Sequence, residues 1–147
     1  MKISEQYLID GPVEAQLIAK QIEKTNSKTD IGGHAFFLGQ VRRDKIKDKF
    51  VSKIIYSAYE QMVSKELDKI KENIYAKYDD VKSIEIIHSI GGVNAGEISM
   101  FVMTSAGHRI QAFDSCREIV DLIKAHAPIW KKEVLEDDSY KWTGSEL

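Results

Sequence analysis

Apolar positions along the chain follow two periods, and their order predicts a mixture of helices and strands. Spacings of three and four residues predict three main helices, over residues 13–22, 63–78 and 110–123. Alternating or continuous apolar runs predict strands over residues 2–9, 32–39, 51–59, 81–90, 97–104, 129–135 and 139–143. Because helices and strands are mixed without strict alternation, the pattern favours an α+β fold with a mixed or antiparallel sheet.

Glycine, proline and charge mark the predicted breaks between these elements. Gly91-Gly92, followed by Asn94-Ala95-Gly96, predicts the turn of a hairpin. The highly charged segment 44–49 predicts a mobile loop, and Pro128 predicts that the third helix ends nearby. Five apolar side chains are expected to form the buried stripe of that helix: Ile110, Phe113, Cys116, Val120 and Ile123.

Composition narrows the possible classes of protein. The 147 residues, 43% of them apolar and 30% charged, are typical of a globular protein and predict one domain over residues 1–147. No apolar run approaches the roughly 18 residues of a membrane span, and the first residues lack the apolar stretch of a signal peptide. We therefore expect a cytoplasmic protein without membrane contact. A net charge of −2 gives no support for nucleic-acid binding.

The positions of the cysteine and the histidines give little indication of a disulfide, a metal site or a catalytic role. The single cysteine, Cys116, excludes an intrachain disulfide framework and a zinc site built from several thiolates. Its place on an apolar stripe predicts a buried structural thiol. His34 and His88 lie within apolar strands, which is more typical of structural residues than of ligands. The four histidines show no ligand spacing, so we expect neither a metal nor another cofactor.

Basic residues gather in the second half of the chain with few acids beside them. Ser105-Ala106-Gly107-His108-Arg109 opens the third helix, Lys124 lies near its end, and Pro128-Ile129-Trp130-Lys131-Lys132-Glu133 follows. Free N–H groups and a partial positive charge make a helix N-terminus attractive to anions. Because the net charge of the chain is −2, this positive charge is local. The pattern predicts a site for a small phosphorylated or carboxylated ligand.

Spacing constrains how such a site could be assembled. Arg109 and Lys124 are fifteen residues apart, which along a helix is roughly 22 Å. The chain therefore has either two anion sites or one site completed across a symmetric dimer. We hypothesise a C2 dimer that places His108 and Arg109 of one protomer beside Lys124 and Lys131 of its mate. Strand alternation puts Lys131 and Lys132 on opposite faces, so at most one of them shares a pocket with Lys124.

Several of these segments together resemble the large, catalytic subunit of molybdopterin synthase. The matching residues are Phe37-Leu38-Gly39-Gln40-Val41-Arg42, Ile87-His88-Ser89-Ile90-Gly91, Thr104-Ser105-Ala106-Gly107-His108-Arg109, Leu122-Ile123-Lys124-Ala125-His126-Ala127-Pro128-Ile129-Trp130-Lys131-Lys132-Glu133 and Tyr140-Lys141-Trp142. They occur in the family's order over about residues 30–143, and the block that contains Pro-Ile-Trp-Lys-Lys-Glu is the most specific. The resemblance implies an α/β hammerhead-like fold with three main helices and an additional small antiparallel sheet.

The resemblance also implies an activity and its partners. The family consists of sulfurtransferases of molybdenum cofactor biosynthesis, which convert cyclic pyranopterin monophosphate (precursor Z) into molybdopterin by inserting two sulfurs. The sulfur arrives as a C-terminal Gly-Gly thiocarboxylate on a small ubiquitin-like subunit. Two large subunits form the central homodimer of a heterotetramer. We therefore expect the pterin as substrate, and a sulfur-carrier subunit and a second copy of this chain as partners.

The resemblance assigns individual positions to the site. Lys124 and Lys131 match the two catalytic lysines, and the cations that surround Lys124 are expected to lower its pKa. The other matching or flanking positions in the substrate-binding pocket are Gln40, Val41, Arg42, His108, Arg109, Lys132 and Glu133. Arg42, His108 and Arg109 match residues that hold the phosphate. The choice of Lys131 over Lys132 as the pocket lysine comes from the resemblance alone.

The chain departs from the family pattern at two positions, and two functions other than sulfur transfer also fit its cluster of cations. Gly107 is one residue more than the usual Ser-Ala-His-Arg, and Ser89 stands where an arginine is common. The same cluster of cations could belong to a non-catalytic module that docks a ubiquitin-like tail or a phosphorylated ligand. It could also belong to a different phosphate-handling enzyme. Turnover of a pterin precursor in the presence of a thiocarboxylated carrier separates these functions.

Overall fold

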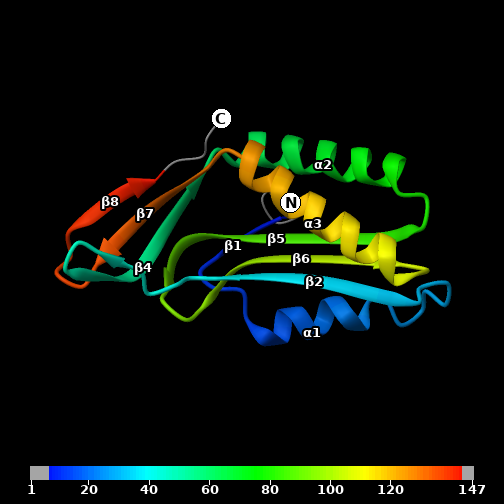
Figure 1. Ribbon diagram of the computed structural model, residues 1–147, viewed down its shortest axis with the longest axis horizontal. Coiled ribbons are helices and arrows are strands. Elements are labelled where there is room, and N and C mark those ends of the chain that lie inside the picture. The colour runs from blue at the N-terminus through cyan, green and yellow to red at the C-terminus, as the bar shows by residue number, and fades with distance from the viewer. Residues whose placement is uncertain (1–6, 144–147) are drawn as a thin grey trace.

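A computed structural model describes residues 7–143 of the chain (Figure 1). Over these residues the elements follow in the order β1 (Leu8–Asp10), α1 (Ala15–Glu23), β2 (Gly33–Gln40), β3 (Lys45–Ile46), β4 (Lys49–Ala58), α2 (Glu60–Lys77), β5 (Val81–Asn94), β6 (Ile98–Ala106), α3 (Arg109–His126), β7 (Ile129–Leu135) and β8 (Tyr140–Thr143). The three predicted helices and the C-terminal hairpin are confirmed. Of the first predicted strand, residues 2–6 lie outside the described part of the chain, and β1 begins at Leu8.

The strands form one mixed sheet with helices on both faces. Its order is β2-β6-β5-β4-β7-β8, in which neighbours are antiparallel, while β1 lies parallel to β5 and β3 pairs with β4. Figure 1 shows α2 and α3 on one face of the sheet and α1 on the other. The α+β prediction, with three helices and an additional antiparallel sheet built by β4, β7 and β8, is confirmed.

Strand β5 joins two parts of the sheet and continues through Gly91-Gly92, so the predicted hairpin turn is confirmed only at its second part, Asn94-Ala95-Gly96. The strand pairs with β6 as far as His88 and then with β4 from Gly91 onwards. Gly91 adopts a φ of 82°, a conformation that a side chain would strain, so the glycine permits the strand to change direction without ending. The turn follows at Ala95-Gly96, where the backbone N–H of Glu97 donates to the carbonyl of Asn94 at 2.9 Å.

The charged segment 44–49 is a hairpin, so the prediction of a mobile loop was wrong. Strand β3 pairs with the start of β4, and Lys47 turns the chain with a φ of 56°. The guanidinium of Arg43 lies 3.7 Å from the centre of the Phe50 ring and pairs with the Glu136 carboxylate at 3.0 Å. Lys49 likewise pairs with Asp137, so charges in and beside this segment contact the turn between β7 and β8 rather than serving solvation alone.

The main core lies between the sheet and the two helices α2 and α3, and it corrects the predicted stripe of α3. Cys116, Val120 and Ile123 are buried as expected. Ile110 and Phe113 are instead 67% and 63% exposed. The residues that complete the buried face are Ala112, Ser115 and Ile119. The N-terminal half of α3 therefore carries two apolar side chains on its outer face, away from the core.

The helices of residues 7–143 lack the combination of length and apolar character that a bilayer span requires.

A close approach of two glycines holds the start of α3 against the start of β2. The N–H of Gly32 donates to the carbonyl of Ala106 at 2.9 Å, and a Cβ atom at Gly32 would overlap the carbonyl oxygen of Gly107. We expect Gly32→Ala to lower the free energy of unfolding by about 1–3 kcal/mol, measured by urea denaturation.

Gly33→Ala is the matched control for this prediction. A Cβ atom at Gly33 would meet nothing within 4 Å, so its stability should stay within about 1 kcal/mol of the parent chain. Equal unfolding midpoints for the two variants would contradict the proposed close packing.

Candidate active site

A pocket of about 470 Å³ opens where the end of α3 meets β7, β4 and the end of β2. Its size suits a small organic ligand. Six of the nine predicted site residues line it: Gln40, Val41, Arg42, Lys124, Lys131 and Glu133. The structure thus brings together residues that are up to 93 positions apart in the sequence, as the separation of Gln40 and Glu133 shows.

Strand register decides which residues of β7 face the pocket. Lys131 pairs with Tyr56 of β4, and both line the pocket, whereas the next pair, Trp130 and Ser57, lies on the other face. Glu133 follows Lys131 by two positions and therefore shares its face. The structure confirms that only one lysine of the pair Lys131-Lys132 enters the pocket.

A β-bulge shapes the opposite wall. The register between β2 and β6 shifts between Gly39 and Gln40. Such an extra residue bends a strand and redirects its side chains. Gly39 and Gln40 consequently both line the pocket, which strict alternation would not allow, and Val41 and Arg42 follow them beyond the end of β2.

Lys124 reaches the pocket from the last turn of α3. Ala127 caps the helix with an extended backbone, and Pro128 follows, so the chain turns directly into β7 and brings Lys131 back beside Lys124. Desolvation by the pocket walls, and then the positive charge of Lys131, lower the pKa of Lys124. The predicted direction of the shift is confirmed, but burial contributes more than the neighbouring cation. A lowered pKa favours the neutral amine, which can accept a proton or act as a nucleophile.

Acidic groups lie closer to the predicted cations than the sequence suggested. The Nε of Arg42 donates to Asp44 Oδ1 at 2.6 Å, and this carboxylate raises the pKa of the exposed Arg42 side chain. Glu133 Oε1 accepts a hydrogen bond from the Thr143 hydroxyl at 2.8 Å. The pocket therefore carries two carboxylates beside its three cations, and both carboxylates are already engaged.

Lys132 lies outside the pocket. Its Nζ sits 4.1 Å from the centre of the Tyr140 ring and 5.9 Å from that of Trp142, both on β8. These cation–π contacts belong to the opposite face of the β7–β8 hairpin. Within the described chain the structure gives Lys132 no path to a ligand in the pocket.

His108 and Arg109 stand at the far end of α3 from the pocket. The Asp80 carboxylate accepts hydrogen bonds from the backbone N–H of His108 at 2.8 Å and from its ring Nδ1 at 3.1 Å. A Cβ atom at Gly107 would collide with this carboxylate, so the additional glycine is what allows Asp80 to approach. An internal carboxylate thus occupies the N-terminus of α3, which we had expected to be free for a ligand.

Sequence reasoning missed His88, Tyr56 and Ser99 as pocket residues. All three are buried in the sheet and line the pocket floor. Nothing in their spacing distinguishes them from ordinary strand residues. The strand pairings that bring β4, β5 and β6 to one place are the signal, and they are visible only in the fold.

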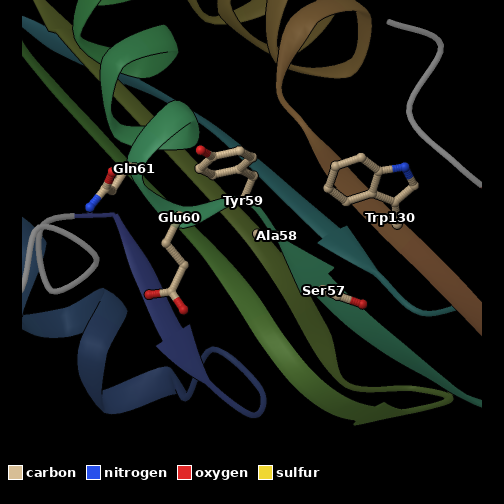
Figure 2. Close-up of a pocket in the computed structure, with 6 residues that line it drawn as sticks. All are labelled: Ser57, Ala58, Tyr59, Glu60, Gln61 and Trp130. Carbon is tan, nitrogen blue, oxygen red and sulfur yellow. The ribbon is translucent and has the colours of Figure 1, made fainter.

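A second hollow, at the start of α2, offers different chemistry (Figure 2). The rings of Tyr59 and Trp130 flank it, while Glu60 and Gln61 extend away from the two rings. None of the predicted cations lines this hollow. The pocket at the end of α3 is therefore the candidate active site.

Cys116 is buried, and burial raises the pKa of its thiol, as a structural role predicts. Over residues 7–143, no group of three or more His, Cys, Asp or Glu side chains is placed to hold a metal ion.

Comparison with known proteins now gives this pocket a context. Residues 10–126 match the family model described as MoaE protein. The chain belongs to the MoaE protein family. The molybdopterin synthase catalytic subunit of Pyrococcus abyssi is 38% identical over 114 residues, which cover 78% of this chain and 76% of that protein. This MoaE chain is therefore related throughout most of its length to catalytic subunits of a transferase.

Solved structures agree with the family assignment. Molybdopterin synthase from Staphylococcus aureus superposes with a TM-score of 0.83 at 28% identity, covering 98% of both chains. A complex of subunits 1 and 2 of molybdopterin-converting factor from Helicobacter pylori shares the fold, with a TM-score of 0.76 at 20% identity, covering 95% of this chain and 89% of that one. The MoaE fold thus accounts for the whole arrangement of helices and sheet described above.

Proposed function

We propose that this chain is a sulfurtransferase that converts cyclic pyranopterin monophosphate into molybdopterin during molybdenum cofactor biosynthesis. The observation that carries the proposal is the convergence of Arg42, Lys124 and Lys131 on one pocket of about 470 Å³. The pterin brings a phosphate and the sulfur donor brings a thiocarboxylate, so both reactants are anions. A pocket lined by three cations attracts both of them.

The roles of the three cations follow from their surroundings. Arg42 is exposed and can present its planar guanidinium to a phosphate once Asp44 yields. Lys124, with its lowered pKa, is suited to move a proton or attack an electrophilic carbon. Lys131 stays beside it and can stabilise negative charge that develops as sulfur leaves the carrier. In each transfer the thiocarboxylate sulfur bonds to a pterin carbon and displaces an oxygen substituent from it. Water then cleaves the acyl–sulfur bond, so the sulfur stays on the pterin and the carrier tail leaves as a carboxylate.

We infer that the sulfur comes from a small ubiquitin-like subunit with a C-terminal Gly-Gly thiocarboxylate. The chain holds no exposed cysteine that could carry sulfur itself, since its one cysteine is buried. The related fold from Helicobacter pylori belongs to a two-subunit complex, which supports a partner of this kind. The composition also supports our proposals of a single domain over residues 1–147 and of a cytoplasmic location.

We further propose that a second copy of the chain completes the pocket. An apolar groove runs between α3 and the edge strand β2, lined by Ala35, Phe36, Phe37, Phe113, Cys116 and Val120 together with Arg117 and Asp121. Among the described strands, β2 pairs only with β6, so its other edge is open for pairing. Open, apolar edges are where chains associate.

The direction of β2 and α3 explains why a two-fold axis would help catalysis. Both elements begin near Gly32 and Gly107, and both end at the pocket. A two-fold axis through the middle of this groove therefore brings the beginning of one protomer's α3 to the end of its mate's. His108 and Arg109 of the mate would then face Lys124 and Lys131, as the spacing of the sequence predicts.

The test of the proposed function is an assay of the purified chain. We expect dithiolene product when the chain is supplied with the pterin precursor and a thiocarboxylated carrier, and none when the carrier ends in an ordinary carboxylate. Absence of product from a folded chain that binds the carrier would reject the enzyme and leave a docking module. A carrier mixed with pterin but without the chain provides the background rate.

A further inference from the structure

His88 lies at the floor of the pocket with a defined tautomer. It is only 6% exposed, and its Nδ1 lies 2.8 Å from the backbone carbonyl oxygen of Ser89. A carbonyl oxygen can only accept a hydrogen bond, so Nδ1 carries the proton. In the neutral ring, Nε2 is then a hydrogen-bond acceptor with a free lone pair.

The neighbours of His88 fix the ring and leave Nε2 open. The Tyr56 ring meets the imidazole edge-on, with centroids 5.0 Å apart and an interplanar angle of 82°. The Tyr56 hydroxyl donates to Ser99 at 3.0 Å, and the Ser99 hydroxyl donates onward to the Gly39 carbonyl at 3.4 Å. Tyr56 therefore has no proton left for His88.

Nε2 of His88 has no hydrogen-bond partner among the described residues, yet it is not sealed. The described side-chain atoms that are both sealed and without a partner are Ser64 Oγ and Ser89 Oγ. Nε2 is not one of them, and the space that His88 lines is the pocket. Because Nε2 is open to the pocket, solvent can satisfy it in the free protein, and a ligand that displaces this solvent must offer a donor in its place.

The ring stays neutral under ordinary conditions. Burial lowers the pKa of His88 to about 4, and the positive charges of Lys124 and Lys131 push it in the same direction, against the opposing effect of the Ser89 hydrogen bond. Near neutral pH the imidazole therefore accepts one hydrogen bond and carries no charge.

We propose that His88 Nε2 accepts a hydrogen bond from an N–H or O–H group of the bound pterin, and so orients the ring while the cations hold the phosphate. The inference rests on the proposed function, because it concerns the same pocket. Arg42, Lys124 and Lys131 offer only donors when charged, and the acceptor sites that remain on the Glu133 and Asp44 carboxylates carry negative charge. His88 Nε2 is a neutral acceptor that Tyr56 and the Ser89 carbonyl hold in place, and it can therefore accept a hydrogen bond from a donor on an uncharged ring.

Three variants distinguish two roles of His88: accepting a hydrogen bond from the pterin, or only packing as a ring in the sheet. His88→Gln can place its amide oxygen near the position of Nε2, His88→Asn can keep only the bond to the Ser89 carbonyl, and His88→Phe keeps only the ring. We expect the Asn and Phe variants to raise the KM and Kd for the pterin roughly 10- to 100-fold. The Gln variant should stay within a few-fold of the parent, and the KM for the carrier should not change.

The outcomes distinguish this inference from the proposed function. Calorimetry with the pterin precursor alone measures binding without any turnover. Equal pterin affinity for the Asn variant and the parent chain, or better rescue by Asn than by Gln, would overturn the role of His88 and leave the enzyme intact. A parent chain that binds the precursor but makes no dithiolene would defeat the function and not the contact.

If the variants fail to fold, a measurement on the unaltered chain still tests the proposal. With ¹⁵N-labelled histidine, the Nε2 resonance of His88 should shift when the pterin precursor is added, because hydrogen bonding changes the shielding of an unprotonated ring nitrogen. The Nδ1 resonance should stay nearly constant. A saturating ligand that leaves Nε2 unmoved would overturn the proposal.

Discussion

Lys124→Ala should reduce the rate of dithiolene formation roughly 100- to 1,000-fold while the chain stays folded and still binds its carrier. Lys124 brings its amine to the pocket from the last turn of α3, where burial and Lys131 lower its pKa. No other described lining residue offers an amine from that wall. The rate is measured with saturating carrier and pterin, and folding is checked by thermal denaturation.

Lys132→Ala is the matched control for this substitution. Lys132 lies on the other face of β7, over the rings of Tyr140 and Trp142. Its removal deletes the same charge from the same region without touching the pocket, so turnover should stay within about twofold of the parent. If both alanine variants lost activity equally, general electrostatic attraction rather than the chemistry of Lys124 would explain the loss.

Two inactive variants, mixed and allowed to exchange subunits, should recover about a quarter of the parent activity. Arg109→Ala removes the phosphate contact proposed at the start of α3, and Lys124→Ala removes the amine at its end. If each pocket takes Lys124 from one chain and Arg109 from the mate, a mixed dimer contains one intact pocket and one doubly altered pocket. Half of the dimers in an equal mixture are mixed, which gives the expected recovery.

A substitution in the apolar groove between α3 and β2 provides the control for this complementation experiment. Phe113 is 63% exposed in the single chain, so Phe113→Asp should not disturb the core, yet it would place two charges near the proposed two-fold axis. Introduced into both variants, it should give monomers in analytical ultracentrifugation and abolish the recovery. Full activity of a monomeric Phe113→Asp chain would show that each protomer builds its pocket alone.

The periodicity of apolar residues was sufficient to predict the helices and most strands, because burial of one face dominates each of them. It failed where a residue had a reason other than the core to be apolar. Ile110 and Phe113 fit the 3.6-residue period as well as Cys116 does, but they form the outer face of α3. A period identifies a set of side chains that lie along a helix; it does not state what covers them.

The glycines and charges were harder to interpret for a related reason. In sequence, Gly91-Gly92 is typical of a turn. In the structure these glycines let β5 pair first with β6 and then with β4. A local sequence pattern does not specify which strands pair. Asp80 is 28 residues away from His108 in the sequence, so the carboxylate at the start of α3 was invisible before the fold was known.

In the candidate site, too, some residues could be predicted from the sequence and others could be recognised only in the fold. Lys124 and Lys131 could be assigned from the sequence because a specific motif surrounds them. Gln40, Val41 and Arg42 also reached the pocket as expected, helped by a bulge that the sequence does not announce. His88 could not be recognised, since its significance depends on an unpaired ring nitrogen and on neighbours from β4 and β6.

The alternation of β7 makes the number of residues between Pro128 and Lys131 decide whether Lys131 faces the candidate active site. A homologue that inserted one residue in this interval would keep every lysine, but it would turn the Lys131 amine away from the pocket and bring the Lys132 amine inward one position further along the strand. Searches for active relatives should therefore count positions from the proline as well as inspect residue types. We expect a relative that keeps both lysines but shifts their positions along β7 to have lost activity.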